Sequence, residues 1–302
     1  MVVRPPRTAV SAAPRGASRR PQLLAASYSA GARILRAVPA GLRYAACTPG
    51  GAAWFWLSRA QRRAALDNYG AVLGREPSDP EVTRVARRAF QNYGRMLTDF
   101  VLLGSLRPEE VLERVEVDGL PLLDEALSRG RGLILALPHM GSWDMAGAYG
   151  AAVGYPMIAV AERFPGSLDA AVVRNRHRFG VNVIALGRSA VREVREALSA
   201  NKVVCLACDL QQGPGVEVSF FGRRAIVPAG PAAFALKSIA PVLLVHSYAS
   251  GPGSYHAVVE KAPEWPSGES NQRAMQSIID CFETYIRARP DQWYAFRPIF
   301  KN

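Results

Sequence analysis

The sequence predicts an α/β fold with a mostly parallel central sheet, flanked by helices and preceded by an N-terminal helical layer. Two observations lead to this prediction. From residue 132 onwards, short apolar runs alternate with segments of helix length, whereas before it apolar residues recur at helical spacing. A chain of 302 residues, of which 49% are hydrophobic, is long enough to bury the core of one substantial α/β domain.

The chain begins with a basic tail and an amphipathic segment. Residues 1–21 are rich in Arg, Ala and Pro and contain no acid. This composition is typical of a disordered basic tail and equally of an organelle transit peptide. Residues 22–38 show the apolar spacing of an amphipathic helix that ends near Pro39. The pattern fits a membrane-facing helix and a helix packed on the domain's own surface equally well.

Two further helices are predicted before the sheet, at residues 58–73 and 80–103. Between Arg43 and Arg59 the chain contains Pro49, followed by two glycines, and this interrupts any apolar run long enough to span a bilayer. Any contact with a membrane is therefore expected to be peripheral.

Short apolar runs of four to six residues are predicted as the strands of the sheet. They occupy residues 133–137, 157–160, 181–184, 203–207 and 241–246. Such runs, separated by helical segments, are typical of parallel strands that are covered on both faces. No repeat and no second domain boundary is visible. Residues 22–302 are therefore expected to form a single domain, mainly helical at 22–110 and α/β at 111–302.

The net charge of +12 is concentrated at one end of the chain. Eleven arginines, from Arg4 to Arg63, precede the first acidic residue, Asp67, and the rest of the chain is nearly neutral. Because these arginines are interleaved with Leu and Trp, the pattern favours an anionic membrane surface as partner. Nucleic acid is not expected, since no zinc-finger spacing, RNP-like aromatic motif or G-x-x-G clamp is present.

The four cysteines are too few and too scattered for a disulfide scaffold, so a reducing compartment is expected. Cys205 and Cys208 form a C-x-x-C pair, which is typical of redox and zinc sites. They lie within an apolar run, however, and no second pair accompanies them. The context favours buried strand cysteines.

The candidate chemistry lies just after the first predicted strand. His139 follows that strand by two residues, at the edge where open α/β sheets bind ligands. Asp144 comes five residues later, and five steps of a regular helix turn by roughly 500°, or about 140° net, so the two side chains would diverge on one helix. Gly141 can form a turn and Ser142 is a plausible N-cap. His139 is therefore expected in a loop and Asp144 in the first helical turn, from which its carboxylate can reach back to the imidazole.

Such a pair has a defined chemical task. Asp144 would fix the tautomer of His139 and stabilise the imidazolium, while the other ring nitrogen removes a proton from a hydroxyl group. A loop histidine beside a capped helix is also common without any catalytic role, so the spacing alone leaves both interpretations open.

The segment from His139 to Asp144 resembles the H-x-x-x-x-D motif of the glycerolipid acyltransferases. It is most similar to the family of bacterial lipid A lauroyl/myristoyl acyltransferases and phosphatidylinositol mannoside acyltransferases. The resemblance runs from about Trp56 to the C-terminus. It includes Ala207-Cys-Asp209, Gly215-Val-Glu-Val-Ser-Phe-Phe-Gly222 and Val227-Pro-Ala-Gly-Pro-Ala-Ala233.

The resemblance implies an acyltransferase that moves a fatty acyl chain from acyl-CoA or acyl carrier protein to a hydroxyl of a membrane glycolipid. Neither a cofactor nor a covalent enzyme intermediate is expected. His139 would be the general base, Asp144 its partner and Glu217 a further catalytic residue, while Arg176 and Asp209 would bind substrate. The protein would act peripherally at the cytoplasmic face of the plasma (inner) membrane.

The acceptor and the function class have alternatives. The lipid A branch often has glutamate at the position of Asp144 and carries an N-terminal membrane span, so a mannoside or other glycolipid acceptor fits this sequence better. A lysophospholipid or another lipid is the alternative acceptor. A serine hydrolase would require a G-x-S-x-G elbow, which is absent. A non-catalytic membrane-binding protein is the alternative from another class.

Overall fold

The computed structural model describes residues 30–164 and 167–301. The predicted tail at 1–21 lies outside these residues, and so does the first part of the predicted amphipathic helix at 22–38. The described part of that segment is helical at residues 30–37. The other helices are α2 (Ala40–Leu57), α3 (Arg59–Leu73), α4 (Pro80–Leu103), α5 (Pro108–Leu112), α6 (Pro121–Leu127), α7 (Trp143–Ala152), α8 (Ser167–Arg178), α9 (Ala190–Ser199), α10 (Gly230–Ser238) and α11 (Asn271–Ala288).

The strands of the main sheet are β1 (Val115–Asp118), β2 (Leu133–Leu137), β3 (Met157–Ala161), β4 (Asn182–Ala185), β5 (Val203–Ala207), β8 (Val242–Gly251) and β9 (Ser254–Lys261). Their order is β1-β9-β8-β2-β5-β3-β4. The predicted strands correspond to β2, β3, β4, β5 and β8, and they are parallel to one another. The prediction of a mostly parallel sheet is therefore confirmed. A separate hairpin is formed by β6 (Val216–Phe220) and β7 (Arg223–Val227).

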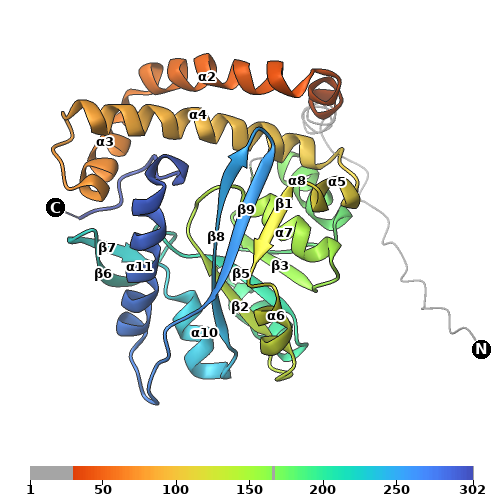
Figure 1. Cartoon of the computed structure of the whole chain (residues 1–302). Coiled ribbons are helices and arrows are strands. Elements are labelled where there is room, and N and C mark those ends of the chain that lie inside the picture. The colour runs from red at the N-terminus through yellow and green to blue at the C-terminus, as the bar shows by residue number, and fades with distance from the viewer. Residues whose placement is uncertain (1–29, 165–166, 302) are drawn as a thin grey trace, which may run out of the picture.

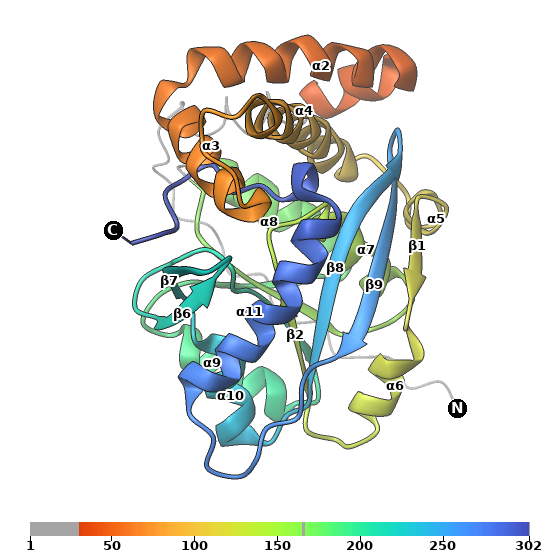
Figure 2. The same cartoon turned by 60° about the vertical axis from the view of Figure 1, so that its left-hand side comes forward.

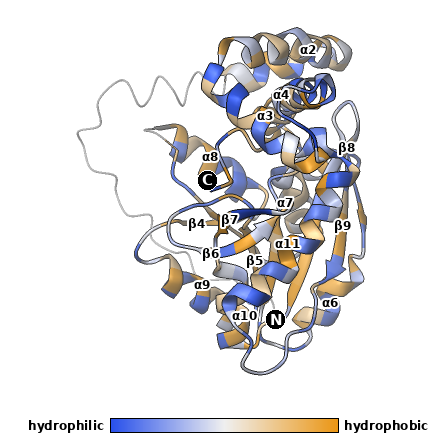
Figure 3. Ribbon diagram, turned by 90° about the vertical axis from the view of Figure 1, so that its left-hand side faces the viewer, coloured by the Kyte–Doolittle hydropathy of each residue, from blue (hydrophilic) through white to orange (hydrophobic). Residues whose placement is uncertain are grey.

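Alternation along the strands divides the core between the two faces of the sheet. Leu133 and Leu135 of β2 point to one face, where they pack with residues of α6. Ile134 points to the other face and packs with residues of α9 and α10. Helix α11 covers the part of that second face formed by β8 (Figure 2). In Figure 3, which is coloured by hydropathy, the strands of the main sheet are largely apolar and lie between helices.

The helix at residues 30–37 together with α2, α3 and α4 forms the helical layer. This layer lies across the end of the sheet at which the parallel strands finish (Figure 1). Helix α4 begins at Pro80, where Asp79 caps it by accepting a hydrogen bond of 2.7 Å from the Glu81 backbone N–H. Helix α2 continues through Pro49 and packs closely on α4. A Cβ on Gly51 would lie only 2.5 Å from the Cα of Gln91, so glycine permits this close packing. No helix of the described chain is long and apolar enough to cross a bilayer.

A buried carboxylate ties the helical layer to the sheet. Asp99 of α4 is almost fully buried and accepts hydrogen bonds from the hydroxyls of Tyr44, on α2, and Tyr255, on β9. The Tyr255 bond is 2.6 Å long. Burial raises the pKa of Asp99, although the two hydroxyls and nearby arginines oppose the shift. This cluster fixes the position of α2 and α4 relative to the sheet.

Candidate active site

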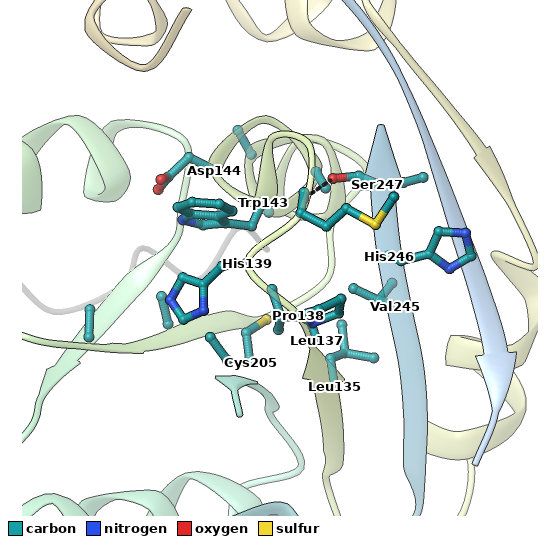
Figure 4. A pocket seen from close by; sticks show the side chains of 18 of the residues that line it. Leu135, Leu137, Pro138, His139, Trp143, Asp144, Cys205, Val245, His246 and Ser247 are labelled. Atoms are coloured by element: carbon teal, nitrogen blue, oxygen red, sulfur yellow. Dashed lines mark hydrogen bonds between the residues drawn. The ribbon is translucent and has the colours of Figure 1, made fainter. Parts of the chain in front are cut away.

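A cavity of about 550 Å³ opens at the carboxyl end of β2, beside His139. This volume is in the ordinary range for small-molecule sites. Figure 4 shows the side chains of Leu135, Leu137 and Val245 in its wall. Towards the helical layer the wall becomes aromatic and carries a few polar groups. The cavity therefore has two regions that meet at His139. The apolar region is bordered by Leu135, Leu137 and Val245, and the aromatic and polar region lies towards the helical layer.

The loop that carries His139 is held by the C-terminal segment and by β8. The His139 carbonyl accepts a hydrogen bond from the Tyr294 N–H, and the Gly141 N–H donates to the Gln292 carbonyl. Gly141 has φ +64°, and a Cβ here would lie 2.1 Å from the Ser247 carbonyl oxygen, so only glycine fits. The predicted loop position of His139 is confirmed.

Helix α7 begins where the sequence predicted, with Asp144 in its first turn. Ser142 occupies the predicted N-cap position, but its side chain makes no capping hydrogen bond. Instead, its backbone N–H donates to the Ser247 hydroxyl. The start of α7 is thus fixed by its contact with β8 and not by a side-chain cap.

The imidazole of His139 is paired with Asp209, which follows the adjacent strand β5. The distance from His139 Nδ1 to Asp209 Oδ1 is 2.6 Å. The other oxygen, Oδ2, accepts hydrogen bonds from the His139 backbone N–H at 3.0 Å and from Trp293 Nε1 at 2.7 Å. Asp209 is therefore an acceptor for Nδ1–H, and this tautomer leaves Nε2 free to act as a base.

Asp209 is fully buried, yet it remains in the ionised form that this pairing requires. Burial alone would raise the pKa of Asp209. The electrostatic interaction with the His139 imidazole and the hydrogen bonds from His139 and Trp293 outweigh burial, and the pKa of Asp209 lies below its ordinary value. The carboxylate is thus ionised, which suits the stabilisation of an imidazolium at His139.

The predicted direct contact between Asp144 and His139 is wrong. Asp144 Oδ1 instead accepts a hydrogen bond of 2.7 Å from Nε of Arg176, on α8. In Figure 4 the Trp143 ring is drawn between the Asp144 carboxylate and the imidazole. The reason lies in the sheet order: β5 is paired with β2, so Asp209 emerges beside the loop of His139, whereas Asp144, in the first turn of α7, faces Arg176 of α8.

The two residues predicted to bind substrate have different positions. Arg176 lines the cavity, and its ion pair with Asp144 holds the guanidinium in place. A substrate contact of Arg176 stays a prediction. Asp209 has no exposed surface and its two oxygens face His139 and Trp293, so the predicted substrate contact is replaced by a contact with the imidazole.

The structure does not bring Glu217 into the cavity. This residue lies on the β6–β7 hairpin, where its side chain is 46% exposed and forms a two-point ion pair with Arg224. Hydrogen bonds from Arg224 lower the pKa of Glu217. The catalytic role of Glu217 stays a prediction, and the geometry gives it no contact with His139.

A row of aromatic rings, which the sequence analysis did not single out, leads from His139 to the helical layer. The imidazole meets the Trp143 ring edge-on, with 5.3 Å between centroids. Trp143 is followed by Tyr294 at 6.2 Å, Tyr294 by Tyr93 at 5.0 Å, and Tyr93 by Trp54 at 5.6 Å. We call Trp54, Tyr93, Trp143 and Tyr294 the aromatic wall; all four line the cavity.

Comparison with known proteins decides the family. The model of the family described as bacterial lipid A biosynthesis acyltransferase matches residues 18–302. The chain belongs to the bacterial lipid A biosynthesis acyltransferase family. This confirms the resemblance seen in the motifs, and the protein is an O-acyltransferase.

Two relatives of this acyltransferase are similar over most of its length. The phosphatidylinositol mannoside acyltransferase of Mycolicibacterium smegmatis is 32% identical over 289 residues, which cover 90% of this chain and 89% of the relative. The phosphatidylinositol mannoside acyltransferase of Mycobacterium tuberculosis is 33% identical over 240 residues, covering 76% of this chain and 74% of the relative.

The cysteines of the acyltransferase are free thiols. Burial raises the pKa of the Cys205 thiol to about 12, and burial also raises the pKa of the Cys208 thiol well above its ordinary value. Both thiols are therefore protonated near neutral pH, and they are poor nucleophiles and poor metal ligands. Cys205 contributes a small apolar side chain to the cavity wall.

Proposed function

We propose that this acyltransferase moves a fatty acyl chain from a thioester of CoA or acyl carrier protein to a hydroxyl of a phosphatidylinositol mannoside or a closely similar membrane glycolipid. The observation that carries the proposal is the pairing of His139 with the buried Asp209 at the mouth of an apolar cavity. The names of the two relatives support this acceptor class.

The chemistry follows from the hydrogen bonds of His139. Nδ1–H donates to Asp209, so Nε2 accepts the proton of the acceptor hydroxyl as its oxygen attacks the thioester carbonyl carbon. The tetrahedral intermediate then collapses, the bond between carbon and sulfur breaks, and the leaving thiolate takes the proton from the imidazolium. Asp209 stabilises the positive charge that His139 carries between these steps. No bond to the enzyme is formed.

The two regions of the cavity match the two substrates. The apolar region beneath α7 suits the acyl chain of the donor. The aromatic wall suits a sugar ring, because an aromatic face packs against the C–H face of a sugar while hydroxyls reach polar neighbours. Gln61, Gln212 and the exposed Arg297 supply such neighbours at this end of the cavity. Arg297 can also contact the phosphate of a phosphoinositide acceptor.

The proposal is tested by incubating the purified enzyme with palmitoyl-CoA and with either a phosphatidylinositol mannoside or a lysophospholipid, followed by mass spectrometry of the lipids. We expect one added acyl chain on the mannoside and release of CoA that depends on this acceptor. Acylation of the lysophospholipid alone would favour the alternative acceptor, and release of CoA without any acylated lipid would indicate a thioesterase.

We further propose that the helical layer binds the anionic cytoplasmic face of the plasma (inner) membrane as a peripheral surface. Exposed apolar side chains gather there, among them Trp56 at 56% and Leu57 at 81% exposure, with Ile34 and Leu42 at 65% each. Arg59 and Arg63 are exposed near the end of this surface. The aromatic wall begins at Trp54, two residues before Trp56, so an acceptor lipid would pass from the membrane to His139 along it.

The double variant Trp56→Ser, Leu57→Ser is expected to bind vesicles containing phosphatidylinositol at least about 10-fold more weakly, because it removes two apolar side chains from the interface. Co-sedimentation with vesicles measures this. The matched control is Leu186→Ser, Val191→Ser, which removes two side chains of 41% and 51% exposure from another part of the surface. Equal binding by both double variants would contradict the proposed surface.

A further inference from the structure

We infer that one face of α7, together with Met157, sets the length of the acyl chain that the enzyme transfers. The inference rests on the proposed function in that it assigns the apolar region of the cavity to the acyl chain. It goes further by naming the residues that form the side and the far end of that region. The argument combines the register of the sheet with the small residues of α7.

The sheet side of the apolar region narrows away from His139. Alternation places Met157, Ala159 and Ala161 of β3 on the cavity side. Their neighbours on β5 include Cys205, which pairs in register with Ala159. Near His139, β3 and β5 thus present small side chains, among them Ala161 and Ala207, whereas at the other end of β3 Met157 presents a large one.

The register places Met157 at the bottom of the cavity. Met157 is paired with Val203 on β5, and Val203 is paired with Leu133, the first residue of β2. Val203 and Leu133 are both fully buried and pack with Met157 and Leu123 in one apolar cluster. Met157 therefore lies level with the start of β2, whereas His139 lies just beyond its end.

The depth of the region suits a long acyl chain. Strand β2 takes four steps from Leu133 to Leu137, which at about 3.3 Å per residue span roughly 13 Å, and His139 lies two residues beyond in the loop. The hydrocarbon core of a bilayer is about 30 Å thick, so an acyl chain of one leaflet extends for roughly 15 Å. A chain of that length bound with its thioester at His139 would end near Met157.

The helix side is formed by glycines. Trp143, Gly147 and Gly150 lie on one face of α7, since positions four and seven apart on a helix nearly coincide. Both glycines line the cavity. A Cβ on Gly147 would meet no atom within 4 Å, so this position borders open space. A Cβ on Gly150 would lie 3.1 Å from Sδ of Met157, so the passage closes at this level.

Two substitutions should change the length preference in opposite directions. Leucine at Gly147 fills space beside the chain, and we expect Gly147→Leu to lower the ratio of kcat/KM for palmitoyl-CoA to that for octanoyl-CoA at least about 10-fold. Met157→Ala opens the far end, and we expect it to raise the ratio for stearoyl-CoA to palmitoyl-CoA. Activities are measured in detergent, with release of CoA and mass of the product as readouts.

Gly50→Leu is the matched control. Gly50 lies inside α2, is exposed and likewise borders open space, so the same substitution there should leave the length profile unchanged. If the leucine variant does not fold, Gly147→Ala takes its place. Alanine favours a helix, so this variant should have a higher Tm, and we expect it to shift the acyl-chain-length preference in the same direction but more weakly.

An equal loss with all donors in Gly147→Leu and an unchanged profile in Met157→Ala would overturn the inference. Equilibrium binding of the same acyl-CoAs, measured by isothermal titration calorimetry, tests the inference on chain length separately from the proposed function. If no mannoside is acylated but binding shows the shifted length preference, the proposed acceptor fails and the assignment of the acyl region stands. An unshifted binding profile in active variants refutes the inference alone.

Discussion

Replacing His139 with alanine is expected to lower kcat by about 10²- to 10⁴-fold, the usual contribution of a general base. The acceptor hydroxyl would then have to lose its proton to water. KM for the acyl donor should change little, since the apolar region and the aromatic wall remain. Steady-state rates of CoA release with saturating acceptor measure the effect.

His177→Ala is the control for this experiment. His177 is an exposed residue at the end of α8, so its removal should leave kcat within about twofold, as expected for surface substitutions. An unaltered rate of glycolipid acylation in His139→Ala would contradict the catalytic assignment. It would favour a non-catalytic role for the loop.

Replacing Asp209 with asparagine should have an effect of similar size, about 10²- to 10⁴-fold on kcat, through the tautomer of His139. Oδ2 accepts two N–H groups, so the amide oxygen of asparagine would take that position. The amide NH₂ would then face Nδ1, which would have to become an acceptor. The ring proton would move to Nε2, the atom that must act as the base.

The variant Asp144→Asn tests whether Asp209, as in the structure, or Asp144, as the sequence suggested, is the carboxylate on which the His139 imidazole depends. Because Asp144 contacts Arg176 and not the imidazole, asparagine there should act through the position of α7 and α8 and reduce kcat less than Asp209→Asn does. A larger loss in Asp144→Asn than in Asp209→Asn would show that the imidazole depends on Asp144 during catalysis.

The stability of Asp209→Asn should depend on pH in a defined direction. The folded-state pKa of Asp209 is lowered, so the ionised carboxylate stabilises the native state above its ordinary pKa of about 4. This contribution is lost as pH falls through the lower folded-state value. The difference in unfolding free energy between the two proteins, about 2 kcal/mol near neutral pH for hydrogen bonds to a charged group, should therefore shrink on acidification.

The parallel part of the sheet could be predicted because its central strands, β2 and β5, are largely buried on both faces and its strands read as short apolar runs. Strands β1 and β9 could not, since their burial alternates along the chain and their side chains include Glu116 and His256. The helix α2 was also missed. Its proline and glycines argue against a helix when taken alone, and only its packing on α4 stabilises it.

The sequence predicted the histidine of the site correctly, but it did not predict which carboxylate is paired with that histidine. The position of His139 follows from its place after a buried strand. The choice between Asp144 and Asp209 depends on which strand lies beside β2, and strand order is not encoded in local spacing. Trp293 gave no signal, since a single tryptophan near a short 3₁₀ turn is indistinguishable from a core residue.

The buried carboxylate of Asp99 also affects the order in which parts of the protein fold during synthesis. Its two hydrogen-bonding partners come from opposite ends of the chain, and Tyr255 follows it by 156 residues. At ribosomal rates of about 5 to 20 residues per second, roughly eight to thirty seconds separate the synthesis of the two residues. During that interval α2 and α4 can form, but a buried acid between them still lacks one of its partners. The nascent helical layer, which carries the exposed apolar side chains, is therefore expected to acquire its final position only after β9 has joined the sheet.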